Sequence, residues 1–280
     1  MSNLVKEIAK KLLIKAIDSS SKESGRFELM KQLEDIVPDV SDQYTTFDVD
    51  DIFLEKMVRG LHAFQMSLVQ NACELIDNKD VNIVDIGDSS GTHQRFLRSK
   101  NIINNGKEVN ALSVNLDPVA VNKIKKKGLN AIECRAENLT EHPEFSGDSV
   151  DLFLSFETLE HLFDPISFLR SISLSKGDPY FVITVPYLKK SRVGLHQIRR
   201  KEVKDIYAEN THIFELCPED WKLLFQLSGW EVVHEEVYRM FPRYNPLVLT
   251  SFVWKKLAFD GFFGCVLRKS EKYSSTYRSW

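Results

Sequence analysis

The sequence predicts an α/β protein in which a mostly parallel sheet carries helices on both faces and follows a helical N-terminal segment. From residue 81 onward, short apolar runs alternate with segments of helical periodicity, as successive βαβ units require. Before residue 79, apolar residues recur at helical spacing and no strand-like run occurs. With 280 residues, 43% of them hydrophobic, the chain can build a full core around such a sheet.

Residues 1–78 are predicted to form a helical extension. A serine-rich break is expected at 18–25, and a second helix is expected at 27–36. Residues 49–77 follow as one long helix or as two shorter helices broken near Gly60. Three roles are open for this extension: a lid over a substrate, a layer docked on the sheet, or a dimer contact.

The sheet domain is predicted over 79–270, with a polar tail over 271–280. Its strands are expected at 83–86, 109–115, 131–134, 150–156, 180–185, 230–238 and 262–269, and its helices at 92–100, 118–127, 165–174 and 218–228. The βα alternation favours right-handed crossovers between parallel strands. A proline-containing segment separates the last two strands, which favours an antiparallel final pair.

Composition excludes several classes of protein. A net charge of −3 argues against a dedicated nucleic-acid binder. The four cysteines, Cys73, Cys134, Cys217 and Cys265, form no CxxC pair, so we expect no metal and no disulfide framework, and a reducing cytoplasm fits best. No apolar run approaches the roughly 20 residues of a membrane span, and the N-terminus lacks the apolar centre of a signal peptide.

The most informative stretch is 81–91, where an apolar strand stops at a Gly/Ser/Asp turn and a helical segment follows. Asp85 ends the strand at the carboxyl edge, where open α/β sheets bind ligands. Gly87 and Gly91 bracket a turn that favours residues without a side chain. Ser89 stands where a dinucleotide fingerprint would have its middle glycine, so NAD and FAD fit this turn poorly.

Six segments, taken in order, resemble the class I S-adenosylmethionine-dependent methyltransferases. They are VDIGDSSG (84–91), SVNLDPVAV (113–121), CRAENL (134–139), SVDLFLSFETLEHLFDP (149–165), FVITVP (181–186) and HIFELCPEDWKLLFQLSGWEVV (212–233). The first matches the family's D-x-G-x-G-x-G motif except at Ser89. The resemblance implies a Rossmann-like seven-stranded sheet with an antiparallel final strand. It also implies a methyltransferase whose cofactor is S-adenosyl-L-methionine and whose product is S-adenosyl-L-homocysteine.

The resemblance implies a set of cofactor-binding residues: Asp85, Gly87, Asp88, Ser89, Gly91, Asn115, Leu116, Ala136, Glu137, Ser155 and Phe156. Two positions depart from the family pattern. Asn115 replaces the acidic residue that holds the ribose hydroxyls, so either Asn115 binds them without a charge or Asp117 takes part. Asp117 is also placed to cap the helix that begins at Pro118. Arg135 stands where an aspartate often contacts adenine, which makes Glu137 or a nearby backbone amide the expected substitute.

The candidate catalytic residues are His161, Glu160 and His212. The resemblance places Glu160 and His161 on a short turn beside the cofactor, and a histidine has a pKa suited to taking a proton from a hydroxyl. A structural role, with the ring bonded to backbone carbonyls, is the alternative for His161. His212 lies after the fifth strand and can face the acceptor from the opposite side; His196 is a weaker candidate of the same kind.

The acceptor is expected to be a small molecule methylated on a hydroxyl, such as a sugar, nucleotide-sugar or surface-polysaccharide precursor. Two alternatives stay open: N-methylation of a sugar or small amine, and a catalytically silent regulatory protein that binds S-adenosylmethionine. A basic cluster after the fifth strand suits an anionic or phosphorylated acceptor, or forms a solvated loop. Its members are Lys189, Lys190, Arg192, Arg199, Arg200, Lys201 and Lys204. A homodimer is also possible on these observations.

Overall fold

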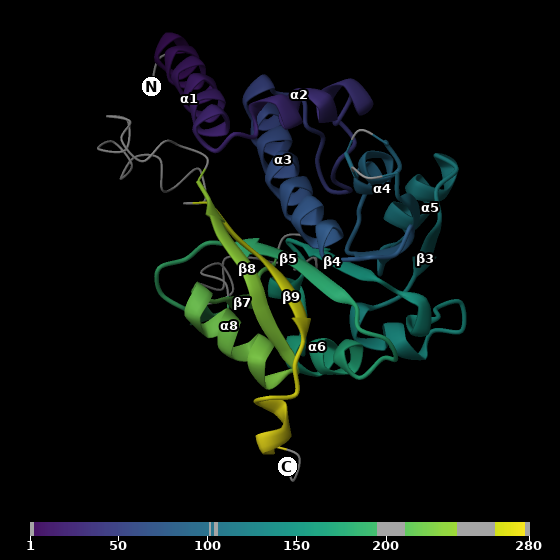
Figure 1. The fold of residues 1–280 in the computed structure, drawn as a ribbon. Helices are drawn as coiled ribbons and strands as arrows, with labels where there is room; N and C mark the ends of the chain where they lie inside the picture. Colours follow the sequence, from purple (N-terminus) through teal and green to yellow (C-terminus); the bar gives the residue numbers. More distant parts are fainter. Residues whose placement is uncertain (1–2, 101, 104–105, 195–210, 240–260, 278–280) are drawn as a thin grey trace.

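The computed structural model describes residues 3–100, 102–103, 106–194, 211–239 and 261–277, and Figure 1 shows their arrangement. A sheet crosses the middle of the molecule, with helices above and below it. The predictions for His196, Arg199, Arg200, Lys201 and Lys204 lie outside the described residues. Among the helices that the structure describes, none has the length and apolarity needed to cross a bilayer.

Seven strands form the main sheet in the order β3-β2-β1-β4-β5-β9-β8. They are β1 (Asp80–Ile86), β2 (Glu108–Asn115), β3 (Ala131–Glu133), β4 (Leu152–Phe156), β5 (Tyr180–Pro186), β8 (Trp230–Tyr238) and β9 (Phe262–Lys269). The strands β1 to β5 pair in parallel, whereas β9 runs antiparallel to both of its neighbours, β5 and β8. The predicted fold class, with its antiparallel final strand, is confirmed.

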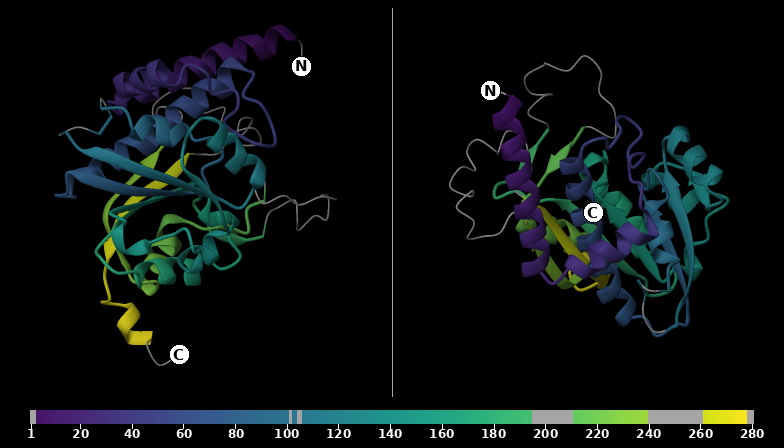
Figure 2. Two further views of the ribbon diagram at one scale, coloured as in Figure 1. Left: turned by 90° about the vertical axis from the view of Figure 1, so that its right-hand side faces the viewer. Right: turned by 90° about the horizontal axis from the view of Figure 1, so that it is seen from above.

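Helices cover both faces of this sheet (Figures 1 and 2). On one face lie α3 (Ile52–Glu74), α4 (Thr92–Leu97) and α5 (Pro118–Lys126), and α3 packs against β4, β5 and β9. On the other face lie α6 (Pro165–Ser173) and α8 (Pro218–Leu227). The outer helices α1 (Asn3–Glu23) and α2 (Phe27–Ile36) pack on α3.

The buried strands read as continuous apolar runs because both of their faces are covered. In β1, Ile83 belongs to the core beneath α3, and the next residue, Val84, belongs to the core beneath α6 and α8. In β5, Val182 faces the first core and its neighbours Phe181 and Ile183 face the second. This period-two division explains why alternation of apolar and polar residues is not visible in these strands.

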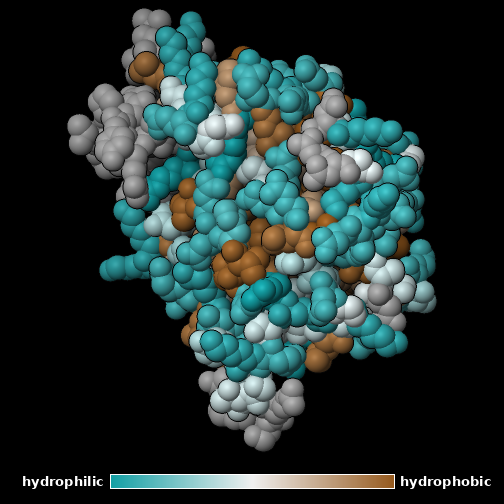
Figure 3. All heavy atoms as spheres, in the orientation of Figure 1, coloured by the Kyte–Doolittle hydropathy of each residue, from teal (hydrophilic) through white to brown (hydrophobic). Residues whose placement is uncertain are grey.

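The surface seen in Figure 3 is largely hydrophilic, and hydrophobic residues show in small groups between the hydrophilic ones. Some large apolar side chains of the described residues remain exposed, among them Phe163 and Leu174. Scattered exposure of this kind is normal for a folded protein, so it does not by itself indicate a docking surface.

The predicted serine-rich break at 18–25 is wrong over most of its length, because α1 continues to Glu23. Tertiary contacts outweigh the modest helix propensity of serine. Ser21 is buried and its hydroxyl contacts Met30 Sδ at 3.8 Å. Gly60 causes no break in α3: a Cβ there would lie 2.4 Å from Tyr238 Oη, so this glycine serves close packing of α3 on β8.

The remaining elements are short. A two-stranded sheet pairs β6 (Arg192–Val193) with β7 (Phe214–Glu215), and the sequence did not predict it. Short 3₁₀ helices cover Ala136–Glu141, Gly147–Ser149, Leu159–His161 and Ser274–Tyr277. In the sheet, β2 and β3 lie on one side of β1, and β4 and β5, which follow them in the chain, lie on the other side. The carboxyl ends of β1 and β4 therefore form the switch point at which such sheets bind ligands.

Candidate active site at the sheet's switch point

The turn after β1 requires glycine at its first position. Gly87 has φ +94°, and a Cβ there would lie 2.0 Å from Thr158 Oγ1. Thr158 is held in place because its hydroxyl donates towards the backbone oxygens of Ile86 and Phe156, at 3.1 and 3.0 Å. Gly91 ends the turn with φ +76° and precedes α4. The start of this turn therefore needs a residue without a side chain, because the side chain of Thr158 packs against it.

Asp88 shapes the same turn from inside. Its Oδ1 accepts from the backbone amides of Ser90 and Gly91, and its Oδ2 accepts from the hydroxyl of Ser113 at 2.5 Å. The residue is only 2% exposed. Both carboxylate oxygens are engaged within the turn and β2, so the geometry gives Asp88 a role in holding the turn's shape.

Asn115, at the end of β2, is tied to the turn as well. Its Nδ2 donates to the backbone oxygen of Asp88 at 2.9 Å, and its Oδ1 accepts from the amide of Asp117 at 2.8 Å. One amide hydrogen and one oxygen lone pair of Asn115 stay available for a further partner. Asp117 caps α5, accepting from the amide of Val119 at 2.8 Å, as the sequence predicted. Leu116, between them, is 44% exposed.

A segment of the N-terminal region, 37–51, lies over the glycine turn. The hydroxyl of Ser89 donates to the backbone oxygen of Gln43 at 2.5 Å, and Gln43 Oε1 faces the hydroxyl of Ser90. Lys123 on α5 fastens the segment, donating to the backbone oxygens of Asp42 and Tyr44 at 2.8 and 3.0 Å. A lid over a substrate was one of the roles open for residues 1–78, but the sequence did not single out this segment or its contact with the turn.

Asp85 forms a buried pair with a histidine that sequence analysis missed. His93 Nδ1 lies 2.8 Å from Asp85 Oδ2, and both side chains are buried. Burial raises the pKa of Asp85. Burial alone would lower the pKa of His93, but the Asp85 charge and hydrogen bond outweigh it and the net pKa is raised. The eight-residue spacing of the two residues across the turn was the available signal, and it is not specific.

His62, on α3, closes this cluster and gives a pH-dependent prediction. Its ring is edge-on to those of His93 and Phe96, and burial holds its pKa well below the usual value. The folded protein therefore keeps His62 neutral, while the unfolded chain takes up a proton below about pH 6.5. Stability therefore falls as the pH drops from 7.5 to 5.5.

Urea unfolding of the wild type and of His62→Leu at both pH values measures this effect. The wild type should lose more stability than the variant on acidification. Equal losses in the two proteins would show that His62 does not carry this pH dependence.

At the end of β3, Ala136 is buried and opens the 3₁₀ helix Ala136–Glu141. Glu137 is half-buried, and its Oε1 lies 3.7 Å from a guanidinium nitrogen of Arg135. Arg135 also lies over the ring of Phe163, 5.9 Å from its centroid. The structure therefore turns the basic side chain of Arg135 towards its neighbours Glu137 and Phe163.

The end of β4 carries polar groups with unmet hydrogen-bonding capacity. Ser155 is fully buried, and neither its hydroxyl nor Glu157 Oε1 has a hydrogen-bond partner among the described residues. Phe156 packs edge-on against His93, with 4.9 Å between ring centroids. Glu157 has φ +52°, a strained conformation for this residue, and burial raises its pKa to about 8. Strain and buried polar groups concentrate here, as they do at functional sites.

The three candidate catalytic residues meet beside this strand end. Glu160 and His161 lie on the 3₁₀ helix that follows β4, and His212 precedes β7. The rings of His161 and His212 are edge-on with centroids 4.8 Å apart. His161 Nε2 lies 3.9 Å from Glu160 Oε1. The backbone joins the two segments, because the amide of Ile213 donates to the oxygen of Glu160 at 2.7 Å.

Glu215, which sequence analysis also missed, orients this cluster. Its Oε1 lies 3.1 Å from His212 Nδ1, and Arg192 on β6 pairs with its other oxygen. Burial alone would raise the pKa of Glu215, but hydrogen bonds from His212 and Arg192 outweigh it and the net pKa is lowered. Burial and then the charge of Glu157 raise the pKa of Glu160 well above the usual value.

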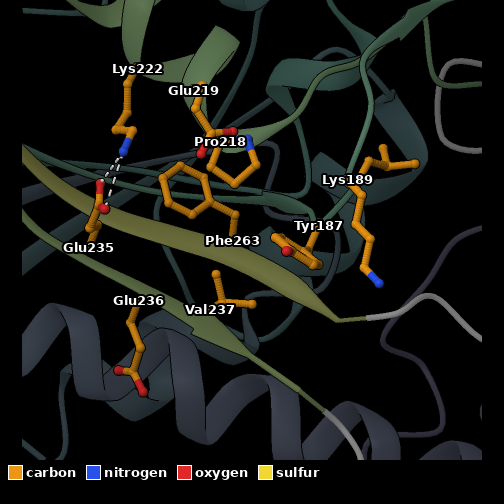
Figure 4. Close-up of a pocket in the computed structure, with 10 residues that line it drawn as sticks. Tyr187, Lys189, Pro218, Glu219, Lys222, Glu235, Glu236, Val237 and Phe263 are labelled. Atoms are coloured by element: carbon orange, nitrogen blue, oxygen red, sulfur yellow. Dashed lines mark hydrogen bonds and ion pairs between the residues drawn. The ribbon is translucent and has the colours of Figure 1, made fainter.

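A separate hollow of about 390 Å³ lies between α8, the ends of β8 and β9, and the segment after β5 (Figure 4). Lys189 and Lys222 line it, together with three carboxylates, Glu219, Glu235 and Glu236. Lys222 is paired with Glu235 at 3.1 Å. Acidic groups outnumber basic ones here, so this hollow offers no support for an anionic acceptor.

The comparisons with known proteins agree with this geometry. Residues 84–174 match the family described as Methyltransferase domain, a stretch that includes the glycine turn, Glu160 and His161. Over these residues the chain carries a methyltransferase domain. It is an enzyme domain whose cofactor is S-adenosylmethionine. A search of the curated proteins finds no match.

Solved structures share the methyltransferase's fold at low sequence identity. One is a "putative sarcosine dimethylglycine methyltransferase" from Galdieria sulphuraria, with a TM-score of 0.54, 14% identity, and coverage of 86% of this chain and 98% of that chain. Another belongs to a complex with the Haloferax volcanii Trm112 methyltransferase activator: TM-score 0.52, 15% identity, coverage 76% and 92%. A third is the (4+2)-cyclase SpnF: TM-score 0.51, 16% identity, coverage 90% and 97%.

The residues of the methyltransferase's turn fit this cofactor. Gly87 lets the turn pass directly beside Thr158, whose side chain occupies the place of a Cβ. The unpartnered Ser155 hydroxyl and Glu157 Oε1 provide polar groups at the adjacent strand end, and the exposed Leu116 provides an apolar surface beside Asn115. An ammonium group, hydroxyls and a purine ring are the chemistry that such a set of groups recognises.

Proposed function

We propose that this enzyme transfers a methyl group to a hydroxyl of a small molecule, and that the acceptor oxygen lies against Glu160, His161 and His212. The observation that carries the proposal is the convergence of these three side chains at the carboxyl end of β4, next to the glycine turn. The bound cofactor supplies an already activated methyl group. The residues of the chain then have to orient the acceptor, exclude water and take up its proton.

His161 suits proton transfer because its tautomer is defined. Its Nδ1 lies 2.8 Å from the backbone oxygen of Thr211, which can only accept, so Nδ1 carries the hydrogen. The basic nitrogen, Nε2, therefore points towards Glu160. A hydroxyl has to lose a proton on methylation, and a proton acceptor so positioned serves that need.

For the cofactor we propose the contacts implied by the family pattern. The backbone at Gly87, Ser89 and Gly91 lies along its amino-acid end, with Asp85 and Asp88 shaping the turn. Asn115 and Leu116 lie at the ribose and adenine, Ala136 and Glu137 lie at the adenine edge, and Ser155 and Phe156 line the floor. The engaged side chain of Asn115 retains one donor and one acceptor for the ribose.

Radiolabelled S-adenosylmethionine tests the proposal when purified protein is incubated with a panel of sugars, nucleotide-sugars, phenols and amines. Methyl transfer to hydroxyl compounds, and not to matched amines, is the expected result. Transfer to amines alone would replace the oxygen acceptor with a nitrogen acceptor. Cofactor binding without transfer to any compound in the panel would favour the silent regulatory alternative.

We also propose that segment 37–51 acts as a cover over the bound cofactor. Lys123→Ala removes two hydrogen bonds to backbone oxygens of this segment, each given by a charged donor. A hydrogen bond from a charged donor contributes about 1.5–3 kcal/mol to stability. If about 1.4 kcal/mol of this is lost from cofactor binding, the dissociation constant for S-adenosylhomocysteine rises about tenfold, which is the change we expect.

Lys125→Ala is the matched control for this variant, because Lys125 is exposed on the same helix. It should leave the dissociation constant unchanged. Calorimetric titration of the two variants decides the question, and equal affinities in both would remove the cover role from segment 37–51.

A further inference from the structure

The cluster at the end of β4 has the composition of a metal site as well as of a proton acceptor. One donor atom from each of Glu160, His161 and His212 lies within 4.8 Å of the others. The three residues come from two segments, which the hydrogen bond from the amide of Ile213 to the oxygen of Glu160 holds together. This arrangement unites ligands that are far apart in sequence.

Both histidines have their second ring nitrogen fixed by an acceptor. His161 Nδ1 donates to the backbone oxygen of Thr211 at 2.8 Å. His212 Nδ1 lies 3.1 Å from the carboxylate of Glu215, which also pairs with the guanidinium of Arg192, so Nδ1 donates to it. In each ring the lone pair is therefore on Nε2. Metal-binding histidines are oriented in this way, with the non-ligating N–H given to a carboxylate or a backbone carbonyl.

Glu160 supplies the independent observation that points to a cation. Its side chain is 1% exposed, and neither carboxylate oxygen has a hydrogen-bond donor among the described residues. The adjacent Glu157 Oε1 lacks one too. An ionised carboxylate buried in this way costs several kcal/mol, and either a proton or a bound cation removes that cost.

A second buried cluster, Asp85, Asp88 and His93, shows the contrast. Its donor atoms also lie within 4.8 Å of one another, but Asp85 pairs with His93 and both oxygens of Asp88 accept hydrogen bonds. In that cluster the carboxylates of Asp85 and Asp88 have hydrogen-bond partners within the protein. The carboxylate of Glu160 has none among the described residues.

We propose that Glu160, His161 and His212 bind a divalent first-row transition-metal ion, of which Zn²⁺ is the reference case. Two imidazoles and one carboxylate are typical ligands for such an ion and leave a coordination position open, whereas Mg²⁺ prefers oxygen ligands. Ligand atoms around a tetrahedral ion lie roughly 3.4 Å apart, so the cluster contracts by about an ångström on binding.

The role of the ion rests on the proposed function, although its binding does not. At the open position it would hold the acceptor's hydroxyl and lower the pKa of that hydroxyl. His161 then acts as a ligand, and the hydroxyl proton leaves to solvent. In this form the site selects acceptors whose oxygen can coordinate a metal.

Titration of the chelator-treated full-length protein with Co²⁺, followed by visible absorbance, tests the site without any acceptor. We expect one equivalent to bind and Zn²⁺ to displace it, with Mg²⁺ at least about 100-fold weaker. Absence of stoichiometric binding of both Co²⁺ and Zn²⁺ would overturn the proposal, as would Mg²⁺ binding as tightly as Zn²⁺.

Variants assign the ligands. Glu160→Gln and His212→Gln should each weaken Co²⁺ binding at least about 100-fold. Glutamine has nearly the shape of a protonated glutamate, so Glu160→Gln should keep the metal-free melting temperature, and a loss of binding is then not a loss of fold. His234→Ala, on an exposed histidine of β8, and Cys217→Ser, on a half-buried thiol, should bind Co²⁺ like the wild type. Wild-type affinity in both ligand variants would contradict the assignment.

A parallel titration with S-adenosylhomocysteine separates this inference from the proposed function. Metal binding without cofactor binding would leave the metal site standing and remove the methyltransferase proposal. Cofactor binding without metal binding would remove the metal site and leave the methyltransferase proposal standing.

Discussion

Replacement of Gly87 by alanine is expected to reduce binding of S-adenosylhomocysteine by about 100-fold or more, and to lower the melting temperature. The substitution meets two obstacles, since φ is +94° and the new Cβ would lie 2.0 Å from Thr158 Oγ1. Left-handed backbone alone costs about 1–2 kcal/mol for a residue with a side chain. Relief of the collision must move either the turn or Thr158, and both line the proposed cofactor site.

Gly25→Ala is the matched control, because Gly25 has φ +72° and a Cβ there would meet no atom within 4 Å. Gly25→Ala should lower the melting temperature through backbone strain alone and leave the affinity for the cofactor unchanged. If Gly87→Ala does not fold, the double variant with Thr158→Ala removes the two closest contacts and should fold with weakened binding. A folded Gly87→Ala protein that binds the product within threefold of wild type would contradict the assignment of the turn.

His161→Ala is expected to reduce turnover with a hydroxyl acceptor by about 10²–10⁴-fold and to leave cofactor affinity nearly unchanged. The ring lies beside Glu160 and His212 and has no place in the glycine turn. The loss follows whether Nε2 takes the proton itself or binds a metal that acidifies the hydroxyl. Measured kcat and a separate titration with S-adenosylhomocysteine resolve the two effects.

His234→Ala serves as its control, since this exposed histidine of β8 lies outside the site. A large loss of cofactor binding with turnover intact would refute the role assigned to His161. So would full turnover in His161→Ala with every hydroxyl acceptor that the wild type methylates.

The sheet was predictable because its buried strands are long apolar runs with turn residues between them. The prolines at 118, 165 and 218 marked the first turns of α5, α6 and α8. The end of α1 was not predictable, because Ser20 and Ser21 remain helical through contacts made by distant residues. Local propensity cannot report such contacts.

The site was predictable only in part. Sequence order places Glu160 and His161 at a strand end, but their meeting with His212 depends on the pairing of β6 with β7 and on Ile213. The pairing of Asp85 with His93 and the placement of Gln43 over Ser89 are tertiary. Such contacts leave no periodic or compositional trace, so they require the structure.

Calorimetric titration of the full-length protein with S-adenosylmethionine and S-adenosylhomocysteine tests the central claim most directly. We predict binding of one equivalent of each, with dissociation constants in the micromolar range, corresponding to about 8 kcal/mol. The Gly87→Ala variant should lose this binding. Absence of binding at near-millimolar cofactor in a folded wild-type protein would contradict the assignment of the carboxyl edge of the sheet as a methyl-transfer site.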